Sequence, residues 1–316
     1  MKPDVLVMAA SPSKDVMSQL EQRFDCHHLW QQPKEQQAAW LAGIADRVRA
    51  VMTTGAIGIR ADLLAQLPRL ELVAVNGVGT DAVDLAATRA RGIAVTNTPG
   101  VLTEDVADLA LALLLAAARR LPAMDAFVRR GAWEAGVALA PSRSLRGKIC
   151  GIFGFGRIGQ AIALRARAFG MEVRYYQPRA IASVAEQRAA SLLELATGSD
   201  YLVVAAPGGP ATHHAVNADV LKALGPQGTL VNIARGSLVD QDALTAALRE
   251  GTLGMAALDV YADEPRVPPA LRELDNVVLT PHIGSLTVET RHAMGQLVVD
   301  NLSAHFSGQP LLTPVA

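Results

Sequence analysis

The sequence has few cysteines, few aromatic residues, almost no net charge and no apolar run of membrane length. Its two cysteines, Cys26 and Cys150, belong to no C-x-x-C pair, so neither a disulfide framework nor a zinc site is predicted. The 29 basic and 30 acidic residues leave a formal net charge of −1, which gives no basic surface for nucleic acid. These absences favour a protein of the reducing cytoplasm with no nucleic-acid partner and no metal.

The longest apolar stretch, LALALLLAAA at residues 109–118, is well short of the roughly 20 residues that a membrane-spanning helix needs. We therefore predict a buried helix there and no membrane partner. The apolar run VLVMAA at residues 5–10 is too short for the core of a secretion signal, and a first strand explains it better.

What the sequence does contain is an alternation of short apolar runs with longer stretches of helical period. One such series covers residues 5–100 and a second covers residues 147–284, and this alternation predicts parallel sheets covered by helices. Aromatic residues make up only 4% of the chain, so alanine, leucine and valine must fill the cores. Because 316 residues are too many for one core of usual size, the predicted fold class is α/β with two doubly wound parallel-sheet domains.

The segment RRGAWEAGVALAPSRSLRG, residues 129–147, interrupts the two series and has no clear period. A structureless loop of that length is unusual inside a compact domain and suggests an arm or an interface. Trp133 lies in it, either as an anchor between two copies of the chain or as a wall lent to a partner's substrate pocket. We favour the first alternative and expect a homodimer.

The motif GFGRIG places Gly154, Gly156 and Gly159 in the G-x-G-x-x-G spacing, directly after an apolar run and at the start of a helical stretch. In that context the first glycine makes a tight turn, the second lets the backbone approach a pyrophosphate, and the third lets helix and strand pack closely. The helix start then offers backbone N–H groups to the phosphates. We predict a dinucleotide site that also includes the intervening residues Phe155, Arg157 and Ile158.

The next strand ends in Tyr-Gln-Pro-Arg, without the acidic residue that binds the ribose hydroxyls of NAD. Arg179 can instead meet a 2′-phosphate, so NADP is the preferred cofactor. The alternative is NAD, with Gln177 on an unphosphorylated ribose and the arginine merely solvated.

At this point the sequence resembles a known family. The segments GFGRIGQAIA, VNIARGSLVD, ALDVYADEP and NVVLTPHIGS, with NGVGTDAVDL and TPGVLTEDVADLALALLLAAARRL in the first half, are similar to those of the D-isomer-specific 2-hydroxyacid dehydrogenases. Within that family the chain is most similar to the glyoxylate/hydroxypyruvate reductases. The resemblance implies reduction of a small 2-oxo acid to the D-2-hydroxy acid.

The resemblance also implies a division of the chain. The substrate-binding domain would be flavodoxin-like and consist of residues 1–98 plus 288–316. An NAD(P)-binding Rossmann domain of residues 99–287 would be inserted into it. Because the chain would cross between the domains twice, a hinge that closes over the substrate is expected.

Three residues are the predicted catalytic set. The resemblance makes His282 the acid/base, and a protonated imidazole can neutralise the oxygen that hydride transfer leaves negative. Glu264 would bond the other ring nitrogen and fix its tautomer. Arg235 ends an apolar strand, and its planar fork suits the parallel acceptors of a 2-oxo acid. Taken singly, His282 also fits an ordinary loop and Arg235 an ordinary surface residue.

The resemblance adds further contacts. The backbone N–H groups of Val78 and Gly79 would hold the substrate carboxylate, together with Arg235 and His282. Asp259 would lie near the nicotinamide carboxamide, although an aspartate that caps the following turn explains it nearly as well. The remaining predicted cofactor residues are Thr103, Pro207, Thr212 and Ile233.

Two uncertainties are left open by the sequence. Glyoxylate, hydroxypyruvate and hydroxyphenylpyruvate share the same carboxylate and carbonyl, and the small Ala56 beside Ile57 is only a weak indication of room for a larger substrate. A non-catalytic, nucleotide-sensing scaffold is the rival from another class, and the complete set of Arg235, Glu264 and His282 argues against it.

Overall fold

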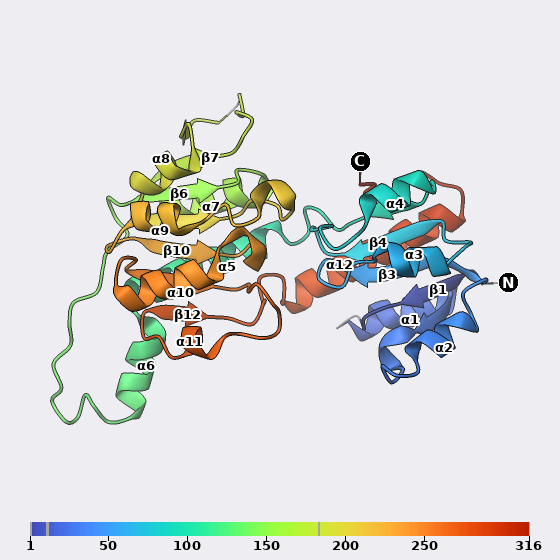
Figure 1. The fold of residues 1–316 in the computed structure, drawn as a ribbon, viewed down its shortest axis with the longest axis horizontal. Helices are drawn as coiled ribbons and strands as arrows, with labels where there is room; N and C mark the ends of the chain where they lie inside the picture. The colour runs from blue at the N-terminus through green and yellow to red at the C-terminus, as the bar shows by residue number, and fades with distance from the viewer. Residues whose placement is uncertain (1, 11–12, 183, 316) are drawn as a thin grey trace. The chain divides into compact units, whose positions relative to one another are not determined.

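The computed structural model describes residues 2–10, 13–182 and 184–315. The chain forms two compact units: unit 1 is Met1–Leu102 with Leu286–Ala316, and unit 2 is Thr103–Ser285. Each unit contains one parallel sheet with helices on both faces, as Figure 1 shows. The predicted α/β fold class with two doubly wound sheets is confirmed.

The sheet of unit 1 has five strands in the order β2-β1-β3-β4-β5, and all of its pairs are parallel. This is the flavodoxin-like order, as predicted. The strands are apolar on both faces, as a covered parallel sheet requires. Their bounds are β1 (Asp4–Val7), β2 (Asp25–His28), β3 (Val48–Thr54), β4 (Leu72–Asn76) and β5 (Ala94–Thr96).

Two groups of helices cover this sheet. One face packs on α2 (Gln37–Ala42), α3 (Ala61–Gln66) and α4 (Leu85–Ala90). The other face packs on α1 (Lys14–Arg23) and on α12 (Val288–Phe306), the predicted last helix. The sequence did not predict β2 or α2. The edge strand β2 is the polar segment DCHH, which has no apolar alternation.

The sheet of unit 2 has seven parallel strands in the order β12-β11-β10-β9-β6-β7-β8. Counted within the unit, this is the Rossmann order 3-2-1-4-5-6 with a seventh strand added at one edge. The strands are β6 (Ile149–Phe153), β7 (Glu172–Tyr176), β8 (Gln187–Arg188), β9 (Tyr201–Val204), β10 (Thr229–Asn232), β11 (Met255–Leu258) and β12 (Val277–Leu279).

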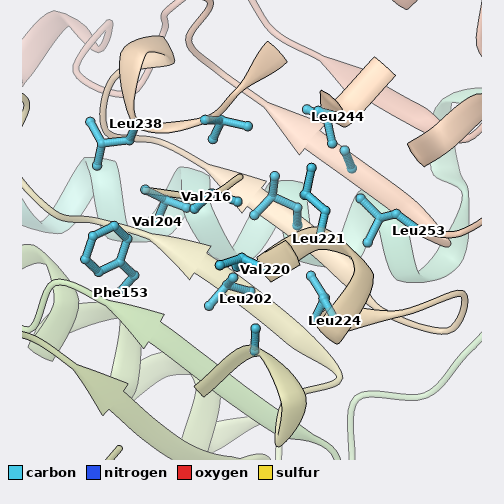
Figure 2. Close-up of a cluster of buried hydrophobic side chains, with 14 of the residues drawn as sticks. Phe153, Leu202, Val204, Val216, Val220, Leu221, Leu224, Leu238, Leu244 and Leu253 are labelled. Carbon is cyan, nitrogen blue, oxygen red and sulfur yellow. The ribbon is translucent and has the colours of Figure 1, made fainter. Parts of the chain in front are cut away.

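Helices α5 (Thr103–Arg119) and α7 (Arg157–Ala168) cover one face of this sheet. The other face packs on α8 (Leu192–Thr197), α9 (Ala218–Leu224), α10 (Gln241–Glu250) and α11 (Pro269–Arg272). Figure 2 shows the core on that side, where side chains of β9, α9 and α10 meet. Short 3-10 turns lie at Leu29–Gln31, Pro210–Thr212 and Gly236–Leu238.

The segment after α5 contains a helix that the sequence did not predict, α6 (Leu121–Arg129). Arg120 takes the left-handed conformation with φ 52° and separates the two helices. Residues 130–148 are irregular and extend away from the sheet of unit 2 in Figure 1, and Trp133 within them is 68% exposed. Among the helices in the described ranges, none is long and apolar enough to cross a membrane.

Candidate active site

His282 and Glu264 form a direct pair in unit 2. Glu264 follows β11 and His282 follows β12, so both lie at the carboxyl ends of neighbouring parallel strands, where ligand sites of open α/β sheets occur. The imidazole Nδ1 lies 2.7 Å from Oε2 of Glu264. An ionised carboxylate only accepts hydrogen bonds, so Nδ1 is the donor, and Nε2 is the nitrogen that can exchange a proton with a ligand.

Glu264 is held ionised by its surroundings. Its partial burial acts to raise the pKa, but the bond from His282, the backbone N–H of Tyr261 and the charge of Arg235 outweigh it and lower the pKa of Glu264. Only 38% of the His282 side chain and 28% of the Glu264 side chain are exposed. The pair is therefore partly shielded yet open to a small ligand.

The backbone of His282 has a conformation that is unfavourable for a residue other than glycine. Its φ of 54° is left-handed, which costs a non-glycine residue on the order of 1 kcal/mol or more. The carboxylate of Asp259 compensates by accepting three hydrogen bonds from the 280–284 loop. The donors are the Thr280 hydroxyl at 2.7 Å and the N–H groups of Ile283 at 2.8 Å and Gly284 at 2.9 Å. Asp259 is 1% exposed, so these bonds are buried.

Arg235 is positioned by an arrangement that the sequence analysis missed. Asn232, the last residue of β10, accepts a hydrogen bond from the N–H of Ala234 and donates one to the carbonyl of Arg235 at 2.9 Å. A Cβ on Gly236 would lie 1.9 Å from the carbonyl carbon of Tyr261, so only glycine allows this close approach between the loops after β10 and β11. An asparagine at the end of an apolar strand, two residues before a turn, was the available indication.

The structure thus brings Arg235, Asp259, Glu264 and His282 to one edge, at the carboxyl ends of three adjacent strands. The two predicted substrate residues of unit 1, Val78 and Gly79, follow β4 at the carboxyl end of the other sheet. Their N–H groups make no hydrogen bond within the described residues, which leaves both donors available to a ligand. Ala56 and Ile57 line a polar pocket of about 410 Å³ in the same unit.

The glycines of the predicted dinucleotide loop differ in the space around them. A Cβ on Gly154, whose φ is +94°, would lie 2.4 Å from the N atom of Ala206, and one on Gly159 would lie 2.2 Å from the carbonyl oxygen of Gly154. A Cβ on Gly156 would meet nothing within 4 Å. The open space lies at the start of α7, where N–H groups point outward, so these residues fit a pyrophosphate.

Phe155 supports the glycine loop from the core. Its ring is fully buried and stacks on Tyr175 at 4.4 Å. Its N–H donates to Oε1 of Gln177, and its carbonyl accepts from Gln160. Both backbone groups of Phe155 thus bond within the protein, and its contact with a cofactor stays a prediction.

The other predicted cofactor residues lie as follows. Arg157 is exposed at the first position of α7, Ile158 is half-buried beside it, and Arg179 is exposed in the loop after β7. The Thr212 hydroxyl donates to the Pro207 carbonyl at 2.7 Å and closes the loop after β9. Ile233 is 8% exposed at the end of β10, and Thr103 is the first residue of α5.

Comparison with known proteins gives this geometry a context. The model of the D-isomer specific 2-hydroxyacid dehydrogenase family, NAD binding domain, matches residues 111–284. The chain is 47% identical over 310 residues to hydroxyphenylpyruvate reductase of Plectranthus scutellarioides, with 98% of each chain covered. It is equally similar, at 47% over 310 residues and 98% of each chain, to glyoxylate/hydroxypyruvate reductase A of Arabidopsis thaliana.

A solved structure agrees with these matches. NADPH-dependent glyoxylate/hydroxypyruvate reductase of Sinorhizobium meliloti, in complex with NADP and malonate, superposes with a TM-score of 0.91 at 42% identity, over 100% of this chain and 97% of that one. The family match covers the loops after β10, β11 and β12 as well as the glycine loop. The chain therefore belongs to the D-isomer specific 2-hydroxyacid dehydrogenase family, as an NAD(P)-dependent oxidoreductase that reduces 2-oxo acids.

Proposed function

We propose that this enzyme reduces glyoxylate or hydroxypyruvate to the D-2-hydroxy acid with NADPH, and that His282 is the general acid. The observation that carries the proposal is the 2.7 Å bond between His282 Nδ1 and Glu264 at the carboxyl edge of the NAD-binding unit. That bond commits Nδ1 and directs Nε2 to the ligand. The names of the two curated relatives and of the NADP-bound structure support the substrate class and the cofactor.

Each residue has one task in the proposed reaction. When bound, the nicotinamide supplies a hydride to the carbonyl carbon of the substrate. His282 gives the proton from Nε2 to the carbonyl oxygen as negative charge develops there. Glu264 stabilises the imidazolium before that transfer and fixes the tautomer after it. The reaction consumes one 2-oxo acid, one NAD(P)H and one proton, and it yields one hydroxy acid and one NAD(P)⁺.

One guanidinium and two backbone N–H groups would bind the substrate. The Arg235 guanidinium, on a turn fixed by Asn232, offers a planar fork to the carboxylate and the adjacent carbonyl. The N–H groups of Val78 and Gly79 in unit 1 complete the carboxylate site in this proposal. Unit 1 is therefore proposed as the substrate-binding domain and unit 2 as the cofactor domain.

The test is the initial rate of NADPH and NADH oxidation with glyoxylate, hydroxypyruvate and hydroxyphenylpyruvate, for wild type and His282→Ala. General acid catalysis contributes about 10²–10⁴-fold, so we expect kcat to fall by that factor in the variant while NADPH still binds. His292→Ala is the matched control, because His292 is an exposed histidine of α12 whose Nδ1 lies 3.3 Å from the Ser13 hydroxyl. The ranking of the three substrates decides between a glyoxylate or hydroxypyruvate reductase and a hydroxyphenylpyruvate reductase.

A wild-type protein that binds NADPH and reduces none of the three acids would overturn the proposed substrates and point to another 2-oxo acid. A His282→Ala variant with near wild-type kcat would remove the proton-donor role. In that case another acid, or water, must supply the proton.

A homodimer in a reducing cytoplasm is also part of the proposal. Large apolar side chains are exposed on α6 and on the irregular segment after it, which is unusual for a surface facing only water. They are Leu121, Val128, Trp133, Val137 and Leu139. A second copy of the chain is the occupant that we propose for them, and light scattering in solution tests it. The two cysteines are unpaired, which suits a reducing compartment.

A further inference from the structure

The loop that follows β7 has three consecutive carbonyl oxygens, and all three are occupied. Arg188 of β8 donates from Nε to the carbonyl of Gln177 at 3.1 Å and from Nη2 to the carbonyl of Pro178 at 2.9 Å. The Gln177 side chain donates from Nε2 to the carbonyl of Arg179 at 2.7 Å. The negative ends of these three peptide groups are therefore each bonded to a donor of the protein.

Arg188 is held in place by the sheet and not by the loop alone. Its own backbone pairs with Tyr175 in the β7–β8 ladder, and the N–H of Ala189 donates to the Tyr175 carbonyl at 2.8 Å. The guanidinium thus reaches the loop from a fixed strand. Two of its N–H directions are used by carbonyl oxygens, in the forked geometry that only arginine offers.

Gln177 joins this loop to the glycine loop. Its Oε1 accepts the N–H of Phe155 at 3.1 Å while its Nε2 donates to Arg179. An aspartate or glutamate here could accept the first bond and could not donate the second. The residue that replaces the usual ribose-binding acid therefore has a structural task that needs an amide.

The charges around the loop favour an anion. The guanidinium groups of Arg157 and Arg179 are exposed and make no hydrogen bond or ion pair in the described residues. Glu172, the first residue of β7, pairs with Arg174, and Glu186, just before β8, pairs with Arg167. The loop presents the guanidinium of Arg179, and the start of α7 presents that of Arg157, while the carbonyl oxygens of the loop are bonded to protein donors.

We propose that Arg188 is a positioning residue for cofactor choice: by holding the carbonyls of Gln177 and Pro178, it presents Arg179 to the 2′-phosphate of NADPH. This inference rests on the proposed preference for NADPH. Arg188 acts through the loop, because its Nε and Nη2 are committed to carbonyl oxygens. Its loss should weaken recognition of a 2′-phosphate and leave recognition of the 5′-phosphate unchanged.

The experiment measures binding and does not need turnover. Adenosine 2′,5′-bisphosphate and adenosine 5′-monophosphate are titrated into the wild type, Arg188→Leu, Arg188→Lys, Arg179→Ala and the double variant Arg179→Ala with Arg188→Leu. Arg174→Leu is the control. It removes the same charge from the neighbouring strand β7, and the Arg174 side chain bonds Glu172 and not the loop carbonyls. Thermal unfolding checks that each variant is folded.

We expect the Kd of the bisphosphate to rise about tenfold in Arg188→Leu and in Arg179→Ala, with the monophosphate Kd unchanged. The bisphosphate Kd of the double variant should be no higher than that of Arg179→Ala, because both substitutions remove the same interaction of Arg179 with the 2′-phosphate. Arg188→Lys should lose as much as Arg188→Leu, since lysine keeps the charge but not the fork. Arg174→Leu should bind like wild type.

Additive losses in the double variant, or wild-type binding by Arg188→Lys, would show that Arg188 acts by charge or direct contact and would overturn the inference. Equal bisphosphate binding by Arg188→Leu and wild type would overturn it too. If wild type binds the bisphosphate no better than the monophosphate, the NADPH preference and this inference both fall. Reduction of a 2-oxo acid with NADH would then still show the reductase activity.

Discussion

Two buried side chains, one in each unit, each hold a loop by accepting two consecutive backbone N–H groups, one as a carboxylate and the other as an amide. Asp259 of unit 2 accepts the N–H groups of Ile283 and Gly284, two consecutive residues of the loop that carries His282. Asn301 of unit 1 accepts two consecutive N–H groups of the C-terminal tail, at 3.0 and 3.2 Å. Both side chains are 1% exposed.

The difference between them follows from their remaining partners. The third partner of Asp259 is the Thr280 hydroxyl, which can donate, so a group that only accepts is fully matched. The amide nitrogen of Asn301 faces the carbonyl of Leu297 at 2.8 Å and the hydroxyl oxygen of Thr313 at 2.9 Å, so a donor is required there. The donor and acceptor sites of the neighbours select the residue, and the charged form occurs at the candidate active site.

Among the substitutions that test this comparison of the two units, Asp259→Asn should have the largest effect on stability and kcat. The new amide N–H₂ must face one of three donors, which leaves buried groups unsatisfied and frees the strained 280–284 loop. We expect the free energy of unfolding to fall by about 2–3 kcal/mol. We expect kcat to fall by about 10²-fold as His282 loses its position. Urea unfolding and initial rates measure the two quantities.

Asp263→Asn is the control, because Asp263 is an exposed aspartate of the neighbouring loop that pairs with Arg266. The NADPH dissociation constant decides what Asp259 does. A constant near that of wild type supports the positioning of His282, whereas a large rise supports the nicotinamide contact that the sequence analysis predicts.

A smaller effect is expected for the reverse substitution, Asn301→Asp. A carboxylate oxygen would face the Leu297 carbonyl, and the tail would lose its support from α12. We expect the free energy of unfolding to fall by about 1–3 kcal/mol, with kcat of the folded enzyme close to that of wild type. Asn276→Asp is a matched control within unit 2, where the amide also donates to two carbonyls at a distance from the active site. A loss of kcat in Asn301→Asp that matches the loss in Asp259→Asn would end the distinction between the two units.

The sequence predicts the parts of the fold whose causes are local. The apolar run at β6 and the apolar residues 109–118 of α5 are visible because burial leaves a continuous apolar pattern. The polar edge strand β2 and the short β8 are not, because pairing with a neighbouring strand fixes them and neither contains a continuous apolar run. Helix α6 was missed because a single left-handed residue, Arg120, separates it from α5.

The candidate site shows the same limit. His282, Glu264 and Arg235 follow strands and belong to motifs, so their convergence could be predicted. The supporting bonds could not, because each depends on where the backbone of a loop lies. Asp259 bonds the N–H of Gly284, which is 25 residues further along the chain. Asn232 bonds the N–H of Ala234, two residues away, in a turn whose geometry only the structure gives.

The smallest expected effect is a difference in how stability depends on pH, between a variant of unit 2 and a variant of unit 1. The pKa of Glu264 is lowered in the folded chain, so its pairing stabilises the fold above the ordinary glutamate pKa of about 4.3 and is lost as the pH falls through the folded value. Glu264→Gln should therefore be less stable than wild type near about pH 5, by less than about 1 kcal/mol, and this difference should shrink toward about pH 3. Asn301→Ala, which removes no ionisable group, should lose the same stability at both pH values. Urea unfolding at the two pH values compares them. A deficit of Glu264→Gln that is independent of pH would mean that its carboxylate is held by shape and not by charge.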